Sequence, residues 1–164
     1  MRYIVLFFIL LMCTSCFYAG SYHNAEVYIF EVSKDELVNK IRVFKDQNPE
    51  YKLVTTLENG QTGEYPDGFD EQGVFFYMLF YLEDRDMVLQ CVINMSDYIG
   101  DTPSSILLNS VSDGIHFRSW KDFNTKSLSR KDNRELKKVF EQEILDQLNI
   151  SWKKKRWWHY LSEL

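Results

Sequence analysis

The chain of 164 residues is poor in the residues that build unusual scaffolds, with three cysteines, seven glycines and three prolines. Three cysteines exclude a disulfide framework, because such frameworks need several pairs. The scarcity of glycine and proline excludes collagen-like and linker-dominated chains. An aromatic fraction of 16% and a charged fraction of 26% exclude wholesale disorder. The composition therefore predicts one folded domain of ordinary size.

The sequence also lacks the best-known catalytic motifs. It has no Gly-Xaa-Ser-Xaa-Gly nucleophile elbow, phosphate-binding loop, His-Glu-Xaa-Xaa-His helix or dinucleotide-binding fingerprint. No cofactor is therefore expected. The net charge of −5 argues against a general nucleic-acid binder. These absences favour a non-enzymatic protein over the familiar enzyme classes.

The first sixteen residues have the layout of a secretory signal. Arg2 precedes an apolar run at residues 4–12. As a helix, this run would span about 14 Å, half of a hydrocarbon core of about 30 Å. An uncleaved membrane anchor is the alternative. Signal peptidases require small side chains at −1 and −3, and cleavage after Ser15 places Ser15 and Cys13 there. Cys16 would then begin the mature chain.

Residues 11–16, Leu-Met-Cys-Thr-Ser-Cys, resemble the lipobox of bacterial lipoproteins. Thr14 and Ser15 match that pattern, whereas Cys13 stands where leucine is usual. The resemblance implies that residues 1–15 are removed and that Cys16 is acylated, which makes membrane lipid a partner of this chain. It also implies a bacterial cell envelope protein, and the absence of an acidic cluster after Cys16 favours the periplasmic side. It carries no information on the fold.

Cysteine usage agrees with this interpretation. Loss of Cys13 and lipidation of Cys16 leave Cys91 alone, so no intramolecular disulfide can form. In a strand-like segment, Cys91 shares one face with the apolar residues Met87, Leu89, Ile93 and Met95. This environment predicts a buried, inert thiol. A eukaryotic secreted protein is the competing interpretation, because Asn94 and Asn149 begin tripeptides that match glycosylation acceptors.

Residues 16–24 are expected to be a lipidated start and a short tether. The eight residues 17–24 reach at most about 27 Å when fully extended, so the domain should stay close to the lipid surface. Residues 25–164 are expected to form a single domain that ends in a basic, aromatic tail at residues 152–164.

Hydrophobic periodicity predicts elements in the order β-α-β-β-β-β-β-α. Helices are expected to begin at Ser33 and Ser129. The expected strands are residues 25–32, 51–57, 74–82, 87–93, 105–112 and 115–120. Short loops demand antiparallel pairing, which predicts an α+β fold: one antiparallel sheet of about five to six strands with two helices packed on it. Residues 74–82 are apolar on both faces, so helices on one side alone would leave an aromatic surface on the other.

Charge is segregated along the chain. Residues 50–101 hold eleven acidic against two basic side chains, and residues 116–156 hold twelve basic against six acidic ones. The acidic residues gather in the glycine-rich segment 58–73 and in the turn at 83–86. Either the two halves are solvated and attract one another, or an acidic face steers a basic partner. The second interpretation gives five candidate partner-binding residues: Asp67, Asp70, Glu71, Tyr77 and Tyr81.

Two further groups of side chains are candidates for binding. Alternation in the strand expected at 115–120 places His116, Arg118 and Trp120 on one face, where they line a ligand pocket or form a solvated edge. The C-terminal segment combines cations with tryptophans in an expected short amphipathic helix, which suits a membrane interface. Its members are Trp152, Lys153, Lys154, Lys155, Arg156, Trp157 and Trp158. The alternative is that these tryptophans pack on the domain's own sheet.

The loop carboxylates do not follow a known metal-binding pattern. Glu64, Asp67, Asp70 and Glu71 lack the alternating ligands of an EF-hand, so no metal is expected. The sequence predicts a lipid-anchored envelope protein whose domain binds a protein partner without catalysis, for example an immunity-type inhibitor or an accessory subunit. An envelope hydrolase or small-ligand-binding protein that uses His116, Arg118 and the loop carboxylates is the alternative.

Overall fold

The computed structural model describes residues 22, 24–57, 60–95 and 103–155. The signal-like segment, Cys16 and most of the tether lie outside the described residues, as do Arg156, Trp157 and Trp158. Among the residues that are described, no helix is both long enough and apolar enough to cross a membrane.

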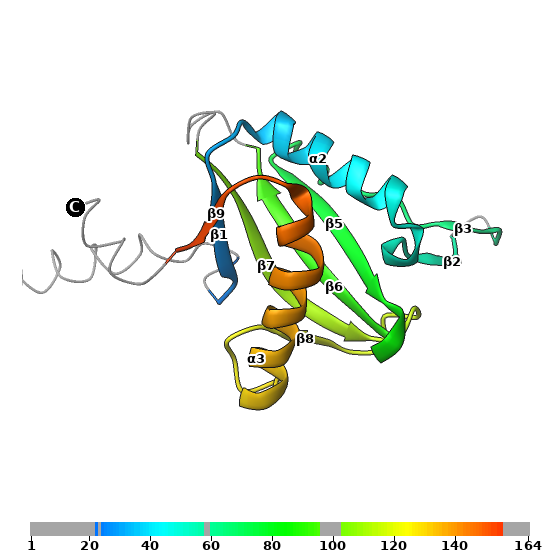
Figure 1. Cartoon of the computed structure of the whole chain (residues 1–164). Helices are drawn as coiled ribbons and strands as arrows, with labels where there is room; N and C mark the ends of the chain where they lie inside the picture. The colour runs from blue at the N-terminus through cyan, green and yellow to red at the C-terminus, as the bar shows by residue number, and fades with distance from the viewer. Residues whose placement is uncertain (1–21, 23, 58–59, 96–102, 156–164) are drawn as a thin grey trace, which may run out of the picture.

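A large antiparallel sheet forms the centre of the fold (Figure 1). Six of its seven strands follow the order β4-β5-β6-β7-β1-β9, and the seventh, β8, pairs with β7. The bounds are Glu26–Phe30 (β1), Gly68–Phe69 (β4), Phe75–Leu82 (β5), Met87–Asn94 (β6), Ser104–Asp113 (β7), Trp120–Asp122 (β8) and Trp152–Lys154 (β9). Every pairing in it is antiparallel. The predicted α+β class is confirmed.

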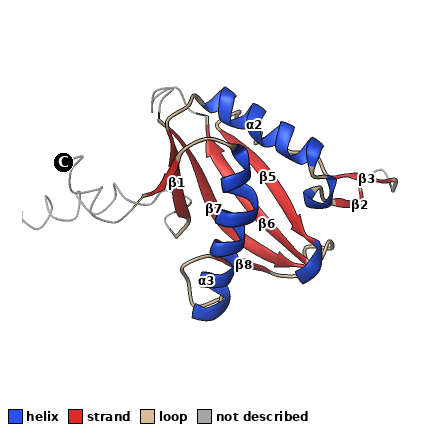
Figure 2. Ribbon diagram, viewed as in Figure 1, coloured by secondary structure: helices blue, strands red, loops and turns tan. Residues whose placement is uncertain are grey.

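Two helices pack on one face of this sheet (Figure 2). Helix α2 spans Lys34–Gln47, and helix α3 spans Arg130–Val139. The chain after α3 continues through a π-helical turn, Phe140–Ile144, and a 3-10 turn, Leu145–Leu148. Both helices begin where the sequence predicts. The Oγ of Ser33 accepts the N–H of Glu36, and the Oγ of Ser129 accepts the N–H of Asp132, which satisfies a free amide at each first turn.

The main core lies between the two helices and the sheet. Alternate residues of β5 point into it, and Phe76 and Phe80 are buried. The ring of Phe80 lies 6.5 Å from that of Phe44 on α2 and 5.9 Å from that of Phe140. These contacts join both helices to the central strands, because large rings bury much apolar surface and add favourable edge contacts.

The opposite face of the sheet carries a smaller apolar cluster. Leu79 of β5 and Val88 of β6 are buried there with Leu53, and Tyr81 packs against them. Leu53 precedes a small ribbon of two antiparallel strands, β2 (Val54–Thr56) and β3 (Thr62–Glu64). Ile115 and Phe117 from the turn after β7 also pack on this cluster. We call this side of the sheet the second face.

Two expectations about strands are wrong. Of residues 51–57 only β2 is extended, because a 3-10 turn at Pro49–Tyr51 occupies the start. Strand β2 pairs with β3, which lies inside the glycine-rich segment 58–73, instead of joining the main sheet. Residues 115–120 are not a strand either. Positive φ angles at Gly114 (70°) and Phe117 (50°) turn the chain there, and β8 begins only at Trp120.

The C-terminal segment also differs from the expected helical extension. Residues Trp152–Lys154 form strand β9, which pairs with β1. A short isolated helix is marginal in water, whereas the open edge of β1 offers backbone hydrogen bonds to any extended segment beside it. The partner strand therefore decides the conformation of this part of the segment.

A buried ion pair closes the edge of β5 next to β4. The Nζ of Lys45 on α2 lies 2.7 Å from both carboxylate oxygens of Asp67 and donates to the carbonyl of Leu79 at 2.7 Å. The carboxylate of Asp67 also accepts the N–H of Leu79 at 3.1 Å. Edge strands present unpaired backbone groups. The pair satisfies both groups of Leu79 and ties α2 to the sheet.

Replacing Lys45 with Met should lower the free energy of unfolding by about 3 kcal/mol, because Asp67 would keep a buried charge without a counter-ion. The double change Lys45→Met with Asp67→Asn removes both charges and should recover part of that loss. Urea denaturation followed by tryptophan fluorescence measures both values. Lys131→Met, at a side chain that is 75% exposed, is the control. A loss below about 0.5 kcal/mol in Lys45→Met would contradict the role given to the pair.

The thiol of Cys91 lies in the main core and is completely buried, as the sequence predicts. Burial raises the pKa of this thiol well above its usual range. We expect iodoacetamide at pH 8.5 to leave Cys91 unmodified in the folded chain and to alkylate it in denaturant, with mass spectrometry as the measurement. Rapid alkylation without denaturant would contradict this placement.

Candidate functional site

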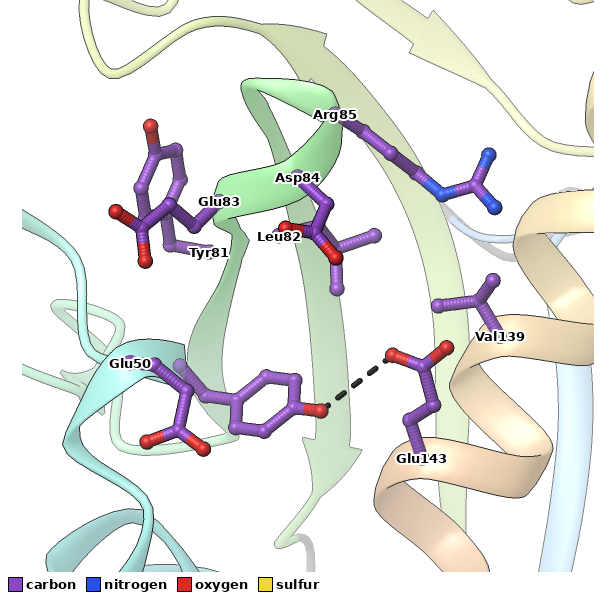
Figure 3. A pocket seen from close by; sticks show the side chains of 9 residues that line it. Glu50, Tyr81, Leu82, Glu83, Asp84, Arg85, Val139 and Glu143 are labelled. Carbon is purple, nitrogen blue, oxygen red and sulfur yellow. Dashed lines mark hydrogen bonds between the residues drawn. The ribbon is translucent and has the colours of Figure 1, made fainter.

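An acidic pocket of about 360 Å³ opens between the β5–β6 turn and α3 (Figure 3). Four carboxylates line it, from Glu50, Glu83, Asp84 and Glu143, against the single cation of Arg85. Its apolar and aromatic lining comes from Tyr51, Tyr81, Leu82 and Val139. Such a pocket favours a cationic group that also carries apolar atoms.

The β5–β6 turn presents two of these carboxylates. Residues Glu83–Arg85 form a 3-10 turn that ends at Asp86, whose φ of 47° is left-handed. The hydroxyl of Tyr81 donates to the carboxylate of Asp86 at 3.1 Å, and the carbonyl of Asp86 accepts the N–H of Gly114 at 2.7 Å. These two hydrogen bonds of Asp86 hold the turn in place, and the side chains of Glu83 and Asp84 stay exposed.

On the other side of the acidic pocket, a hydrogen bond joins the turn after α2 to the helical segment after α3. The hydroxyl of Tyr51 donates to Glu143 at 3.4 Å, the dashed line in Figure 3. Burial, and then the charge of Glu143, raise the pKa of Tyr51. The phenol therefore stays protonated and keeps donating at neutral pH. In Figure 3 the carboxylates of Asp84 and Glu143 point into the same space.

A second hollow, which we call the aromatic groove, lies on the second face and has a volume of about 970 Å³. Tyr77 and Leu79 of β5 and Gln90 of β6 line it from the sheet. Tyr65, just after β3, and Trp120 of β8 line it from outside the central strands. The two outer rings are each 41% exposed.

Phe117 organises the aromatic groove. Its ring contacts Tyr65 edge-on and stacks on Trp120, with centroid distances of 5.5 Å in both cases. Its φ of 50° is costly for a residue with a large side chain. The two ring contacts compensate for this backbone strain. We call Tyr65, Phe117 and Trp120 the aromatic cluster.

The candidate ligand-binding residues lie in or beside this groove. His116 and Trp120 line it, and Arg118 is exposed next to Phe117 in the same turn. The prediction that strand alternation places these three side chains on one face is wrong, because residues 114–117 form a turn. The turn nevertheless keeps the three side chains in one short segment.

Two of the candidate partner-binding residues act inside the fold. Asp67 forms the buried ion pair with Lys45. The carboxylate of Asp70 accepts the N–H groups of Val74 and Phe75 at 2.7 and 3.1 Å, which shapes the entry to β5. Both carboxylates therefore carry structural roles in the described chain.

The other three candidates are distributed over different surfaces. Glu71 is exposed beside the entry to β5. Tyr77 is half-buried in the aromatic groove, and its hydroxyl lies 2.5 Å from that of Tyr22 in the tether. Tyr81 lines the acidic pocket.

The described part of the C-terminal candidates builds the edge of the sheet. The ring of Trp152 packs on Tyr28 at 5.5 Å, and its Nε1 donates to Asp146 at 3.0 Å. Lys154 pairs with Glu141 at 2.6 Å. Lys153 is exposed, and the backbone N–H of Lys155 donates to the carbonyl of Val27.

Sequence reasoning did not identify Glu50 and Glu143 as members of a site. They come from the turn after α2 and from the helical segment after α3, so no linear spacing connects them. The acidic turn at residues 83–86 was the visible part of the acidic pocket. Among the described residues, no three His, Cys, Asp or Glu side chains gather as metal ligands.

Comparisons with protein-family models, with curated proteins and with solved structures give no match. The two hollows and the charges around them are therefore the basis for assigning a function.

Changing Phe117 to Gly should leave the chain more stable than Phe117→Ala by about 1 kcal/mol, because only glycine takes a positive φ without a steric penalty. Both variants lose the ring, so the difference isolates the backbone strain. Urea denaturation of the two variants side by side measures it. A more stable alanine variant would show that the position stores no strain.

Proposed function

We propose that this chain is a lipid-anchored protein of the bacterial cell envelope whose domain binds a protein partner without catalysis. The acidic pocket is the observation that carries the binding role. Its four carboxylates surround an aromatic and aliphatic lining, next to the β5–β6 turn. The lipobox-like residues 11–16 support the anchor.

The charge of the acidic pocket favours a basic segment of the partner. Glu83 and Asp84 are exposed, so they act on a partner before contact, and complementary charge speeds such encounters. A lysine or arginine side chain has a cationic head and an apolar stem. The head suits the carboxylates, and the stem suits Tyr51, Leu82 and Val139.

The position of the acidic pocket suits an anchored binding module. The tether residue Tyr22 packs on Phe75 at the start of β5, with ring centroids 5.2 Å apart. The acidic pocket lies at the other end of that strand, beside Leu82. Eight residues of strand are about 26 Å long. A tether held at Tyr22 therefore leaves the acidic pocket at the end of β5 that lies away from the tether contact.

Reversing both turn charges, Glu83→Lys with Asp84→Lys, should abolish partner binding. Crosslinking in intact envelopes, followed by mass spectrometry, identifies the protein bound to the wild-type chain. That protein is then purified, and its affinity for both chains is measured by calorimetry. We expect a loss of at least about tenfold in the variant, because like charges across an interface repel, and we expect the affinity to fall with added salt.

Glu71→Lys is the matched control, since Glu71 is exposed and lies outside the acidic pocket. It changes the net charge but should keep the affinity within about twofold. Loss of binding in Glu71→Lys with normal binding in the turn variant would place the partner on the segment before β5. Failure to crosslink any protein would remove the binding role itself.

A small-ligand-binding protein or an envelope hydrolase is the second candidate function. One observation favours it: His116 and Trp120 line the same groove as Gln90, so polar and aromatic groups converge there. The test is the variant Trp120→Ala, which leaves the residues of the acidic pocket unchanged. If this variant binds a small ligand more weakly, or hydrolyses it more slowly, than the wild-type chain, the result would favour this function over partner binding.

A further inference from the structure

The tether is fastened to the second face of the sheet. Tyr22 packs edge-on against Phe75, and its hydroxyl lies 2.5 Å from that of Tyr77. Tyr77 belongs to the lining of the aromatic groove. The chain therefore enters the domain beside this groove.

The tether between Tyr22 and the proposed lipid attachment is short. Tyr22 is six positions after Cys16, and a fully extended chain of that length reaches about 20 Å. If Cys16 carries lipid, the contact of Tyr22 with Phe75 on the second face is therefore held within that distance of the bilayer surface. The helix layer, on the other side of the sheet, is farther away.

The second face carries the groups that membrane interfaces favour. Tyr65 and Trp120 are each 41% exposed, and Phe117 holds them together. His116 and Arg118 flank Phe117 and are exposed. Tyrosine and tryptophan rings settle at the level of the lipid headgroups. A guanidinium such as that of Arg118 beside them attracts anionic lipid.

Two of the nearby acidic side chains are compensated, and a third, Asp86, whose carbonyl accepts the N–H of Gly114, has its carboxylate held by the hydroxyl of Tyr81. Glu64, next to Tyr65 in the chain, pairs with Lys52 at 3.2 Å. Asp113, at the start of the turn that holds Phe117, pairs with Lys121 at 2.9 Å. The ammonium of Lys121 lowers the pKa of Asp113. These pairs weaken the repulsion that free carboxylates would exert on an anionic surface.

We propose that the aromatic groove is a docking surface for the bilayer and that the aromatic cluster, with Arg118, sits among the lipid headgroups. The inference rests on the proposed lipid anchor and deepens it, because it gives the anchored domain one orientation. A lipid surface is the occupant that the structure favours, since the tether itself is attached to this face. The acidic pocket remains open to a partner.

A fluorescent label on each side of the sheet tests this orientation. Thr56→Cys places a label at the exposed rim of the aromatic groove, and Val43→Cys places one on α2, where Val43 is 45% exposed. Cys91 is buried and does not compete for the dye. The lipidated full chain is reconstituted in vesicles of phosphatidylethanolamine and phosphatidylglycerol that carry headgroup quenchers.

We expect strong quenching at position 56 and only background quenching at position 43. Arg118→Glu with Trp120→Ser should lower the quenching at position 56 to that background, while acyl labelling of Cys16 and co-sedimentation with vesicles stay unchanged. Arg118→Glu alone, at an exposed side chain, should give an intermediate loss without changing the fold, as circular dichroism would show.

Equal quenching at both positions in an acylated chain would overturn the docking surface and leave the lipid anchor intact. Stronger quenching at position 43 would overturn it as well, because the helix layer would then face the bilayer. A chain without acyl groups that leaves the vesicles would overturn the proposed anchor, and the docking surface with it.

Discussion

Helices α2 and α3 lie on the same side of the sheet, so alternate residues of β5 meet two different environments. Phe76 and Phe80 point into the main core, whereas Tyr77 and Leu79 point to the second face. Large apolar surfaces in water are unfavourable. The chain covers part of the second face with Leu53, the turn at residues 114–117 and Tyr22. Within the part of the chain that the structure describes, the aromatic groove stays uncovered, and Phe117 makes two ring contacts at its positive φ.

Charged residues close the edges of the same sheet. Lys45 and Asp67 satisfy the backbone of Leu79 on the β5 side. On the β9 side, Glu26 of β1 pairs with Lys137 of α3, and Glu141 pairs with Lys154 of β9 while accepting a hydrogen bond from Tyr28. Buried pairs add little net stability over apolar packing, but removing one partner is costly. Part of the segregated charge in the sequence therefore serves the fold, whereas the carboxylates of Glu83 and Asp84 at the β5–β6 turn stay exposed.

Local patterns predicted the features that local physics decides. Ser33 and Ser129 predict the helix starts, because a serine side chain caps a free amide within three residues. The apolar residues that share a strand face with Cys91 predict its burial. The wrong expectations concern segments whose partners are distant. Residues 152–154 are extended because β1 is beside them, and β2 pairs with β3 in a separate ribbon. No linear pattern in the sequence indicates that Glu50 and Glu143 line the same pocket. The acidic pocket shows the same division, since the acidic turn was visible in the sequence and the rest of the lining was not.

Strand β5 connects the two proposed surfaces, with the tether contact at Phe75 and the acidic pocket at Leu82. A net charge of −5 would at first oppose contact with an anionic bilayer. Screening limits this effect, because the Debye length at physiological salt is about 8 Å. The carboxylates at the far end of β5 lie about 26 Å along the strand from the tether contact, so they hardly act on lipid at the tether end. Beside the aromatic groove, Arg118 supplies a cation, and Glu64 and Asp113 are paired with Lys52 and Lys121. The charges of these groups and of Asp86, next to Gly114, therefore decide the proposed contact with the bilayer.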